Sequence, residues 1–181
     1  MKKTKNQKLA LILLALMFAA PAPIAYLFFK HPQWLGAQTN KGELLKPAVS
    51  LNAINNKEKW HLLLWHPGRC DSGCSQQIER LARVRLALGR RLYEVEQWLV
   101  INDSDPALPA ALLNALHEQD IHVLRLNQAQ RQVIERLTGE DRVFIADPNN
   151  YLILSYGLTA KSEDIFHDLK QLLTTVEKKS S

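Results

Sequence analysis

Residues 60–77 read WHLLLWHPGRCDSGCSQQ, an apolar run that leads into a loop with two cysteines. The apolar run, residues 60–65, has the length of a buried strand and stops at a His-Pro-Gly sequence. Apolar residues then recur three or four positions apart over residues 75–91, which is the period of a helix. The sequence therefore predicts a strand, a turn that carries Cys70 and Cys74, and a helix.

The same alternation continues downstream of the cysteines. Strands are expected at residues 98–101, 121–124, 142–146 and 151–155, and helices at residues 109–119, at 128–137 and from residue 162 onward. Asp147-Pro148-Asn149-Asn150 joins the last two strands as a turn, and residues 103–105 are expected to cap the helix that follows them. This order implies an α/β domain with a mostly parallel sheet covered on both faces, to which the terminal hairpin adds an antiparallel edge.

The N-terminal segment carries most of the positive charge. The formal net charge is +5, and lysines at positions 2, 3, 5 and 8 precede residues 9–29, a run without any charged residue. A helix of this length spans about 31 Å, the thickness of a hydrocarbon core. We expect residues 1–8 to be a cytoplasmic tail and residues 9–29 a transmembrane anchor, because lysines beside a span stay in the cytoplasm. A cleavable signal peptide is the alternative, since the small residues of AAPAPIA follow the first apolar run.

The rest of the chain is nearly neutral. Without the four N-terminal lysines it has 19 basic and 18 acidic residues, which argues against a surface that binds nucleic acid. Residues 30–57 contain four Pro and Gly residues and several amides, so we expect a tether and entry loop there rather than packed secondary structure. The periodic domain is expected to occupy residues 58–177.

Cys70 and Cys74 are the only cysteines in the chain. Two cysteines at this spacing can come within the Cα separation that a disulfide accepts. The residues themselves leave three interpretations open: a structural disulfide, a redox-active pair at a strand-to-helix turn, and two thiolates that bind a soft metal such as copper(I). Arg69 favours a thiolate at this place and Asp71 opposes it, and the sequence does not decide between them.

Several motifs together resemble the Sco proteins. They are the apolar N-terminal run, TNKGELLKP at residues 39–47, WHLLLWHPGRCDSGC at residues 60–74 and FIADPNNYLI at residues 144–153. Sco proteins are membrane-anchored assembly factors for cytochrome c oxidase with a thioredoxin fold. The resemblance implies a mixed sheet flanked by helices, with Cys70 and Cys74 as the pair that binds copper and cycles between dithiol and disulfide.

One copper ligand of that family is missing. Sco proteins complete the copper site with a histidine eight residues ahead of the Asp-Pro turn, and the position eight residues before Asp147 is Gly139. His66, which lies four residues before Cys70, is the best substitute as a third metal ligand beside Cys70 and Cys74. The alternative is that His66 is a polar residue at a strand end in contact with water.

The function expected from these observations is oxidase assembly at a membrane. We expect a single-pass protein of the bacterial inner membrane with a periplasmic domain that handles disulfides and copper(I), as a thiol-disulfide oxidoreductase or metallochaperone. Its partners would be the membrane and a respiratory oxidase subunit or another assembly factor. The alternative is a membrane-anchored interaction module without catalytic activity, whose cysteines form a structural disulfide.

Overall fold

The computed structural model describes residues 13–19, 21–30, 40–54 and 58–180, and the chain divides into two units, Met1–Thr39 and Asn40–Ser181. In the first unit, residues 13–19 are helical and α2 comprises Pro21–Lys30. No helix among the described residues is long and apolar enough to cross a membrane. The expected tail at residues 1–8, and residues 9–12 and 20 of the expected anchor, lie outside the described residues, so both stay predictions.

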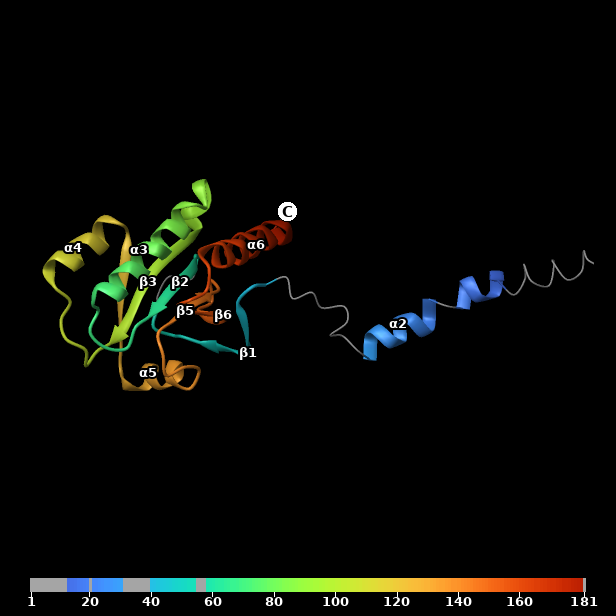
Figure 1. Ribbon diagram of the computed structural model, residues 1–181, viewed down its shortest axis with the longest axis horizontal. Coiled ribbons are helices and arrows are strands. Elements are labelled where there is room, and N and C mark those ends of the chain that lie inside the picture. Colours follow the sequence, from blue (N-terminus) through green and yellow to red (C-terminus); the bar gives the residue numbers. More distant parts are fainter. Residues whose placement is uncertain (1–12, 20, 31–39, 55–57, 181) are drawn as a thin grey trace, which may run out of the picture. The chain divides into compact units, whose positions relative to one another are not determined.

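The second unit contains a six-stranded mixed sheet in the order β1-β6-β5-β2-β3-β4 (Figure 1). The strands are β1 (Glu43–Ser50), β2 (Trp60–Trp65), β3 (Val95–Asn102), β4 (Ile121–Leu126), β5 (Arg142–Ala146) and β6 (Tyr151–Gly157). Only the β2–β3 and β3–β4 pairs are parallel. The expectation of a mostly parallel sheet is therefore wrong, because β5 pairs antiparallel with β2 and puts the terminal hairpin inside the sheet.

Strand β1 is the element that the sequence did not reveal. It lies within residues 30–57, where a loop was expected, and it pairs antiparallel with β6, with Leu44 opposite Leu154 and Val49 opposite Leu152. Its register shifts between Leu44 and Val49, around Pro47. Proline lacks the N–H that an inner strand needs, so it fits here because β1 is an edge strand. The same proline breaks the alternation by which a strand is recognised.

The helices follow the expected order. They are α3 (Ser72–Leu86), the 3₁₀ helix η2 (Gly89–Glu94), α4 (Ala110–Glu118), α5 (Gln128–Glu135) and α6 (Ser162–Ser180). The single helix expected at residues 75–91 is divided after Leu86, and Gly89, the first residue of η2, has a φ of +61°. Glycine adopts this left-handed conformation readily, so the chain changes direction there instead of continuing α3.

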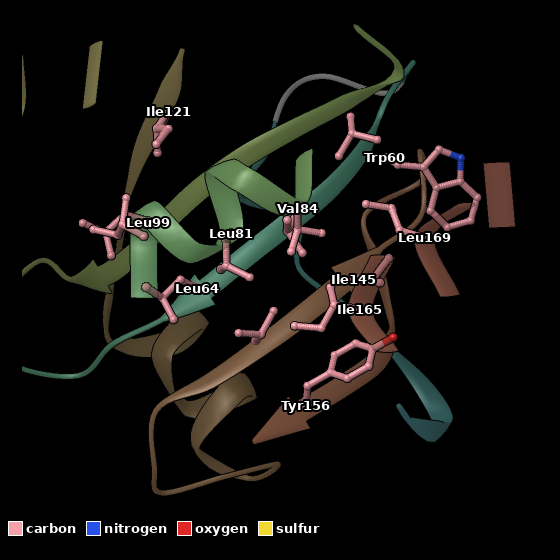
Figure 2. Packing of buried hydrophobic residues seen from close by; sticks show 14 of the residues in the cluster. Trp60, Leu64, Leu81, Val84, Leu99, Ile121, Ile145, Tyr156, Ile165 and Leu169 are labelled. Atoms are coloured by element: carbon pink, nitrogen blue, oxygen red, sulfur yellow. The ribbon is translucent and has the colours of Figure 1, made fainter. Parts of the chain in front are cut away.

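Apolar residues fill both faces of the sheet, as expected for helices on either side. On one face Leu62 and Leu64 of β2 belong to a cluster with the inward faces of α3 and α6, and Figure 2 shows part of this cluster. On the other face Leu63 and Trp65 belong to a cluster that includes Ile134 of α5. Every residue of β2 is therefore buried, and the loop that follows β2 starts from a rigid strand.

Asp168 fastens the beginning of the second unit to α6. Its carboxylate is 1% exposed and accepts hydrogen bonds from the backbone N–H groups of Lys41 (2.7 Å) and Gly42 (2.8 Å) and from the hydroxyl of Tyr156 (2.8 Å). Burial and the bond to Asp168 raise the pKa of Tyr156 far above its usual value, so the hydroxyl stays a donor. A Cβ at Gly42 would lie 2.5 Å from the Tyr156 ring, so this close approach requires glycine.

Candidate functional site

The two cysteines lie between the end of β2 and the first turn of α3. They form a disulfide, with 5.1 Å between their Cα atoms. Cys74 is 3% exposed and packs into the core under α3, whereas Cys70 is partly exposed. The sulfur of Cys70 is therefore the one that a thiol from outside can reach more easily.

Asp71 occupies the N-terminus of α3. Its side chain accepts hydrogen bonds from the backbone N–H groups of Gly73 (2.9 Å) and Cys74 (3.1 Å), which begins the helix at Ser72. The hydrogen bond from the N–H of Cys74 lowers the pKa of Asp71 below its usual value against a smaller opposing effect of desolvation, and the charge of His66 lowers it further. Asp71 thus uses the donors that would otherwise stabilise a thiolate, so it opposes thiolate formation, as its charge suggested.

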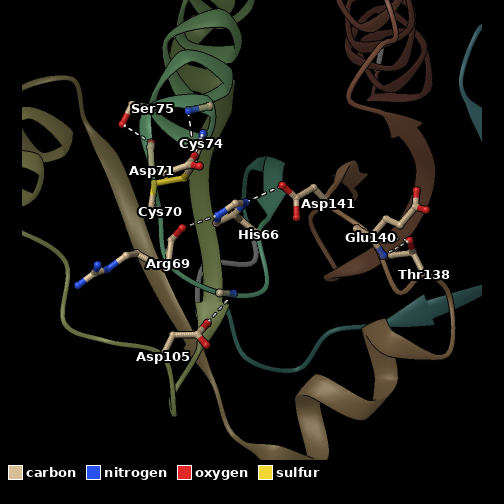
Figure 3. A network of polar contacts seen from close by, with 12 residues as sticks. His66, Arg69, Cys70, Asp71, Cys74, Ser75, Asp105, Thr138, Glu140 and Asp141 are labelled. Carbon is tan, nitrogen blue, oxygen red and sulfur yellow. Dashed lines mark hydrogen bonds and ion pairs between the residues drawn. A yellow bond between two sulfur atoms is a disulfide. The ribbon is translucent and has the colours of Figure 1, made fainter.

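His66 connects the cysteine loop to the loop before β5 (Figure 3). Its Nδ1 lies 2.6 Å from the carboxylate of Asp141, and its Nε2 lies 3.1 Å from the backbone carbonyl of Arg69. A carbonyl oxygen only accepts, so Nε2–H is the donor of the second bond. His66 is therefore held by protein groups at both ring nitrogens rather than by water.

A second anchor of this loop comes from Asp105. Its carboxylate accepts hydrogen bonds from the N–H groups of Asn102 (2.8 Å) and Gly68 (3.2 Å). Residues 103–105 were expected to cap the next helix, and this is wrong: α4 begins after Pro109 without a bond from any side chain. The reason is that the chain folds back after β3, which brings Asp105 against the loop that follows β2 rather than to the start of α4.

His66 and Cys70 lie in the loop between β2 and α3, Cys74 lies in the first turn of α3, and the ring of His66 contacts the carbonyl of Arg69 beside Cys70. The structure adds Asp141, which the sequence did not indicate, and Asp105, for which a helix cap was expected. Asp141 lies 75 positions from His66 along the chain, and Asp105 lies 37 positions from Gly68. The only signal for Asp141 was its place two residues after Gly139, where the Sco histidine was sought.

The mixed sheet with a cysteine pair at its first strand-to-helix turn defines a thioredoxin-like protein. The family model described as "Transmembrane-like, thioredoxin-like, C-terminal domain" matches residues 60–175, and the chain belongs to this family. A search of curated proteins found no match.

Solved structures of Sco proteins share the fold. The crystal structure of yeast Sco1 aligns with a TM-score of 0.53 and 12% identity, and covers 77% of this chain and 97% of Sco1. Arabidopsis thaliana ScoI with copper bound aligns with a TM-score of 0.52 and 10% identity, and covers 74% of this chain and 98% of ScoI. The expected resemblance to Sco proteins is confirmed, and at these identities what it establishes is the fold.

The residues around the cysteines do not fit a copper site of three protein ligands. The two sulfurs are bonded to each other, and both ring nitrogens of His66 are used by other groups. At Gly139, the position of the missing histidine, nothing lies within 4 Å of the place that a Cβ would occupy. Within the described part of the chain, no group of three His, Cys, Asp or Glu side chains is arranged to hold a metal ion.

Proposed function

We propose that this protein exchanges its Cys70–Cys74 disulfide with pairs of thiols on a partner protein. The observation that carries the proposal is the asymmetry of the pair at the start of α3: Cys70 is a partly exposed residue and Cys74 is a buried one. An exposed sulfur admits an attacking thiolate, and a buried one keeps the leaving group in place for the reverse reaction.

The exchange proceeds in two steps. A thiolate of the partner attacks the sulfur of Cys70, the bond between Cys70 and Cys74 breaks, and its electron pair stays on the sulfur of Cys74, which takes up a proton from solvent. The second thiolate of the partner then attacks the partner's own sulfur in the mixed disulfide and releases Cys70. The partner is oxidised by two electrons and the cysteine pair is reduced by two. The reverse sequence reduces a partner disulfide.

We place this activity at the outer face of a bacterial inner membrane, in the periplasm. Residues 9–29 support an anchor by their composition, and the described residues 13–19 are helical with exposed apolar side chains. A compartment that lets disulfides persist fits a protein whose cysteines are joined. The likeness to Sco proteins supports a respiratory oxidase subunit, or another assembly factor, as the partner.

Treatment of the full chain with a reductant is expected to add two hydrogens to its mass, and reoxidation to remove them. Mass spectrometry with and without a thiol-blocking reagent measures this change. A chain that gains no hydrogens under conditions that reduce exposed disulfides would exclude the redox role.

The rival role, a scaffold with a structural disulfide, predicts that the double variant Cys70→Ser/Cys74→Ser supports normal oxidase activity in cells at normal protein abundance.

Copper(I) handling by the reduced pair is the second candidate, favoured by the fold shared with the copper-bound ScoI. We expect His66→Ala to leave the apparent copper(I) affinity of the reduced protein within about twofold, because both ring nitrogens already have partners. Competition with a chelator measures the affinity, and Cys70→Ser/Cys74→Ser is the control that should lose it. A fall of tenfold or more in His66→Ala would identify His66 as a ligand that leaves Asp141 to bind the metal.

A further inference from the structure

Three segments of the chain meet at His66. The ring belongs to the end of β2, Asp141 belongs to the loop before β5, and the carbonyl of Arg69 immediately precedes Cys70 (Figure 3). The side chain of His66 is 13% exposed and that of Asp141 is 30% exposed, so solvent competes only weakly for the 2.6 Å bond between them. These contacts join the backbone beside Cys70 to the rigid centre of the sheet.

The bonds have a defined direction. A carbonyl oxygen only accepts, so Nε2 donates to Arg69, and when Nδ1 also carries a proton it donates to the carboxylate of Asp141. The Nδ1–H bond to Asp141 is then assisted by charge, and such bonds are about twice as strong as neutral ones. Asp141 therefore fixes the orientation of the ring, and the ring in turn fixes the carbonyl of Arg69.

We propose that Asp141 is a positioning residue that acts through His66 to hold the backbone of Cys70 beside Cys74 in both redox states. This inference rests on the proposed exchange at the cysteine pair. Asp141 takes no direct part in the exchange, at either a sulfur or a partner protein. Its effect is to keep the reduced thiols close together, so that closing the disulfide costs little conformational freedom.

The loop between β2 and α3 would have considerable freedom without such anchors. Gly68 has a φ of +118°, a conformation open to glycine, and nothing lies within 4 Å of the Cβ that another residue would have there. Asp105 holds the N–H of Gly68 on one side and His66 holds the carbonyl of Arg69 on the other. The contact made by His66 is the one next to a cysteine, so its loss should change the stability of the disulfide.

Three variants of the full chain test the proposal. Asp141→Ala removes the acceptor. Asp141→Asn also removes the negative charge but keeps a polar side chain of the same size. Its amide N–H can donate to an unprotonated Nδ1, and the ring can still donate from Nε2 to the carbonyl of Arg69. Glu140→Gln removes a neighbouring carboxylate of the same loop, for which the structure shows no bond to His66, and is the matched control. The measurement is the equilibrium between disulfide and dithiol in glutathione buffers, with the melting temperature of each oxidised variant recorded alongside.

Asp141→Ala is expected to shift this equilibrium toward the dithiol by up to about tenfold, because the loop of the dithiol would no longer be ordered in advance, and a hydrogen bond to a charged group can offset an ordering cost of about that size. Asp141→Asn should stay within about threefold of the parent protein and Glu140→Gln within about twofold. Equal constants for Asp141→Ala and Glu140→Gln would overturn the positioning role and leave the exchange activity standing. A parent protein that does not equilibrate with glutathione would overturn both proposals. A shift in Asp141→Asn as large as that in Asp141→Ala would show that charge, and not position, is responsible.

Discussion

Replacing Cys70 by serine is expected to abolish disulfide exchange with glutathione and with partner proteins, whereas Cys74→Ser should retain the first step and stop there. The reason is the difference in access: Cys70 is partly exposed, and Cys74 lies in the core with 3% of its surface exposed. In Cys74→Ser the thiol of Cys70 forms a mixed disulfide that no second cysteine can resolve. In Cys70→Ser the remaining thiol is buried, and Asp71 takes the backbone N–H that could stabilise its thiolate.

The measurement is mass spectrometry of each single variant after incubation with oxidised glutathione. The adduct of one glutathione should accumulate on Cys74→Ser and stay near background on Cys70→Ser. Native and urea-unfolded samples of Cys70→Ser form the internal control, because unfolding exposes Cys74 and should restore its reactivity. Faster adduct formation on native Cys70→Ser than on native Cys74→Ser would reverse the assigned roles.

Asp168→Ala is expected to lower the free energy of unfolding of the second unit by about 4 kcal/mol, since each buried donor left without an acceptor costs about 1–3 kcal/mol. The buried donors are the N–H of Gly42 and the hydroxyl of Tyr156; the N–H of Lys41 and Nδ1 of His167, both in less buried residues, would lose the same acceptor. A loss of this size is a large part of the 5–15 kcal/mol that is usual for a domain. The start of β1 would lose its attachment to α6 at the same time.

Two further variants separate this effect from ordinary damage to α6. Tyr156→Phe removes one of the donors together with its need for an acceptor, and should cost about 1 kcal/mol. Glu163→Ala removes an exposed carboxylate from the first turn of the same helix and should cost no more than about 1 kcal/mol. Urea unfolding followed by tryptophan fluorescence measures all three. Equal losses in Asp168→Ala and Tyr156→Phe would show that the two backbone bonds contribute nothing.

Most of the secondary structure could be predicted because its signals are local. The strand at residues 60–65 and the turn at residues 147–150 stand where apolar runs and turn-forming residues put them. The first and last residues of each helix are harder to predict, because single capping residues determine where a helix begins and ends. Asp71 begins α3 at Ser72 rather than at residue 75, and α3 ends at Leu86 rather than at residue 91, just before the turn at Gly89.

The order of the strands could not be read in the same way. Strand β5 can pair with any open edge as far as its own residues are concerned, and it pairs with the edge of β2 that β3 leaves open, which makes β2 a central strand. Once β5 and β6 lie there, the outer edge of β6 is free to accept β1, a segment interrupted by a proline. Pairing between distant segments is a property of the assembled sheet, and single-strand composition carries little information about it.

Local residue patterns are enough to predict the strand, the turn and the helix that carry Cys70 and Cys74, because apolar periodicity and turn residues act over a few positions. The printed residues also show that the excess positive charge lies in the first eight positions, ahead of an uncharged run. The contacts of His66 with Asp141 and of Asp105 with Gly68 could not be predicted in this way. Those contacts join residues far apart in the chain, and they form only when the sheet brings the ends of its strands and the loops between them to one edge.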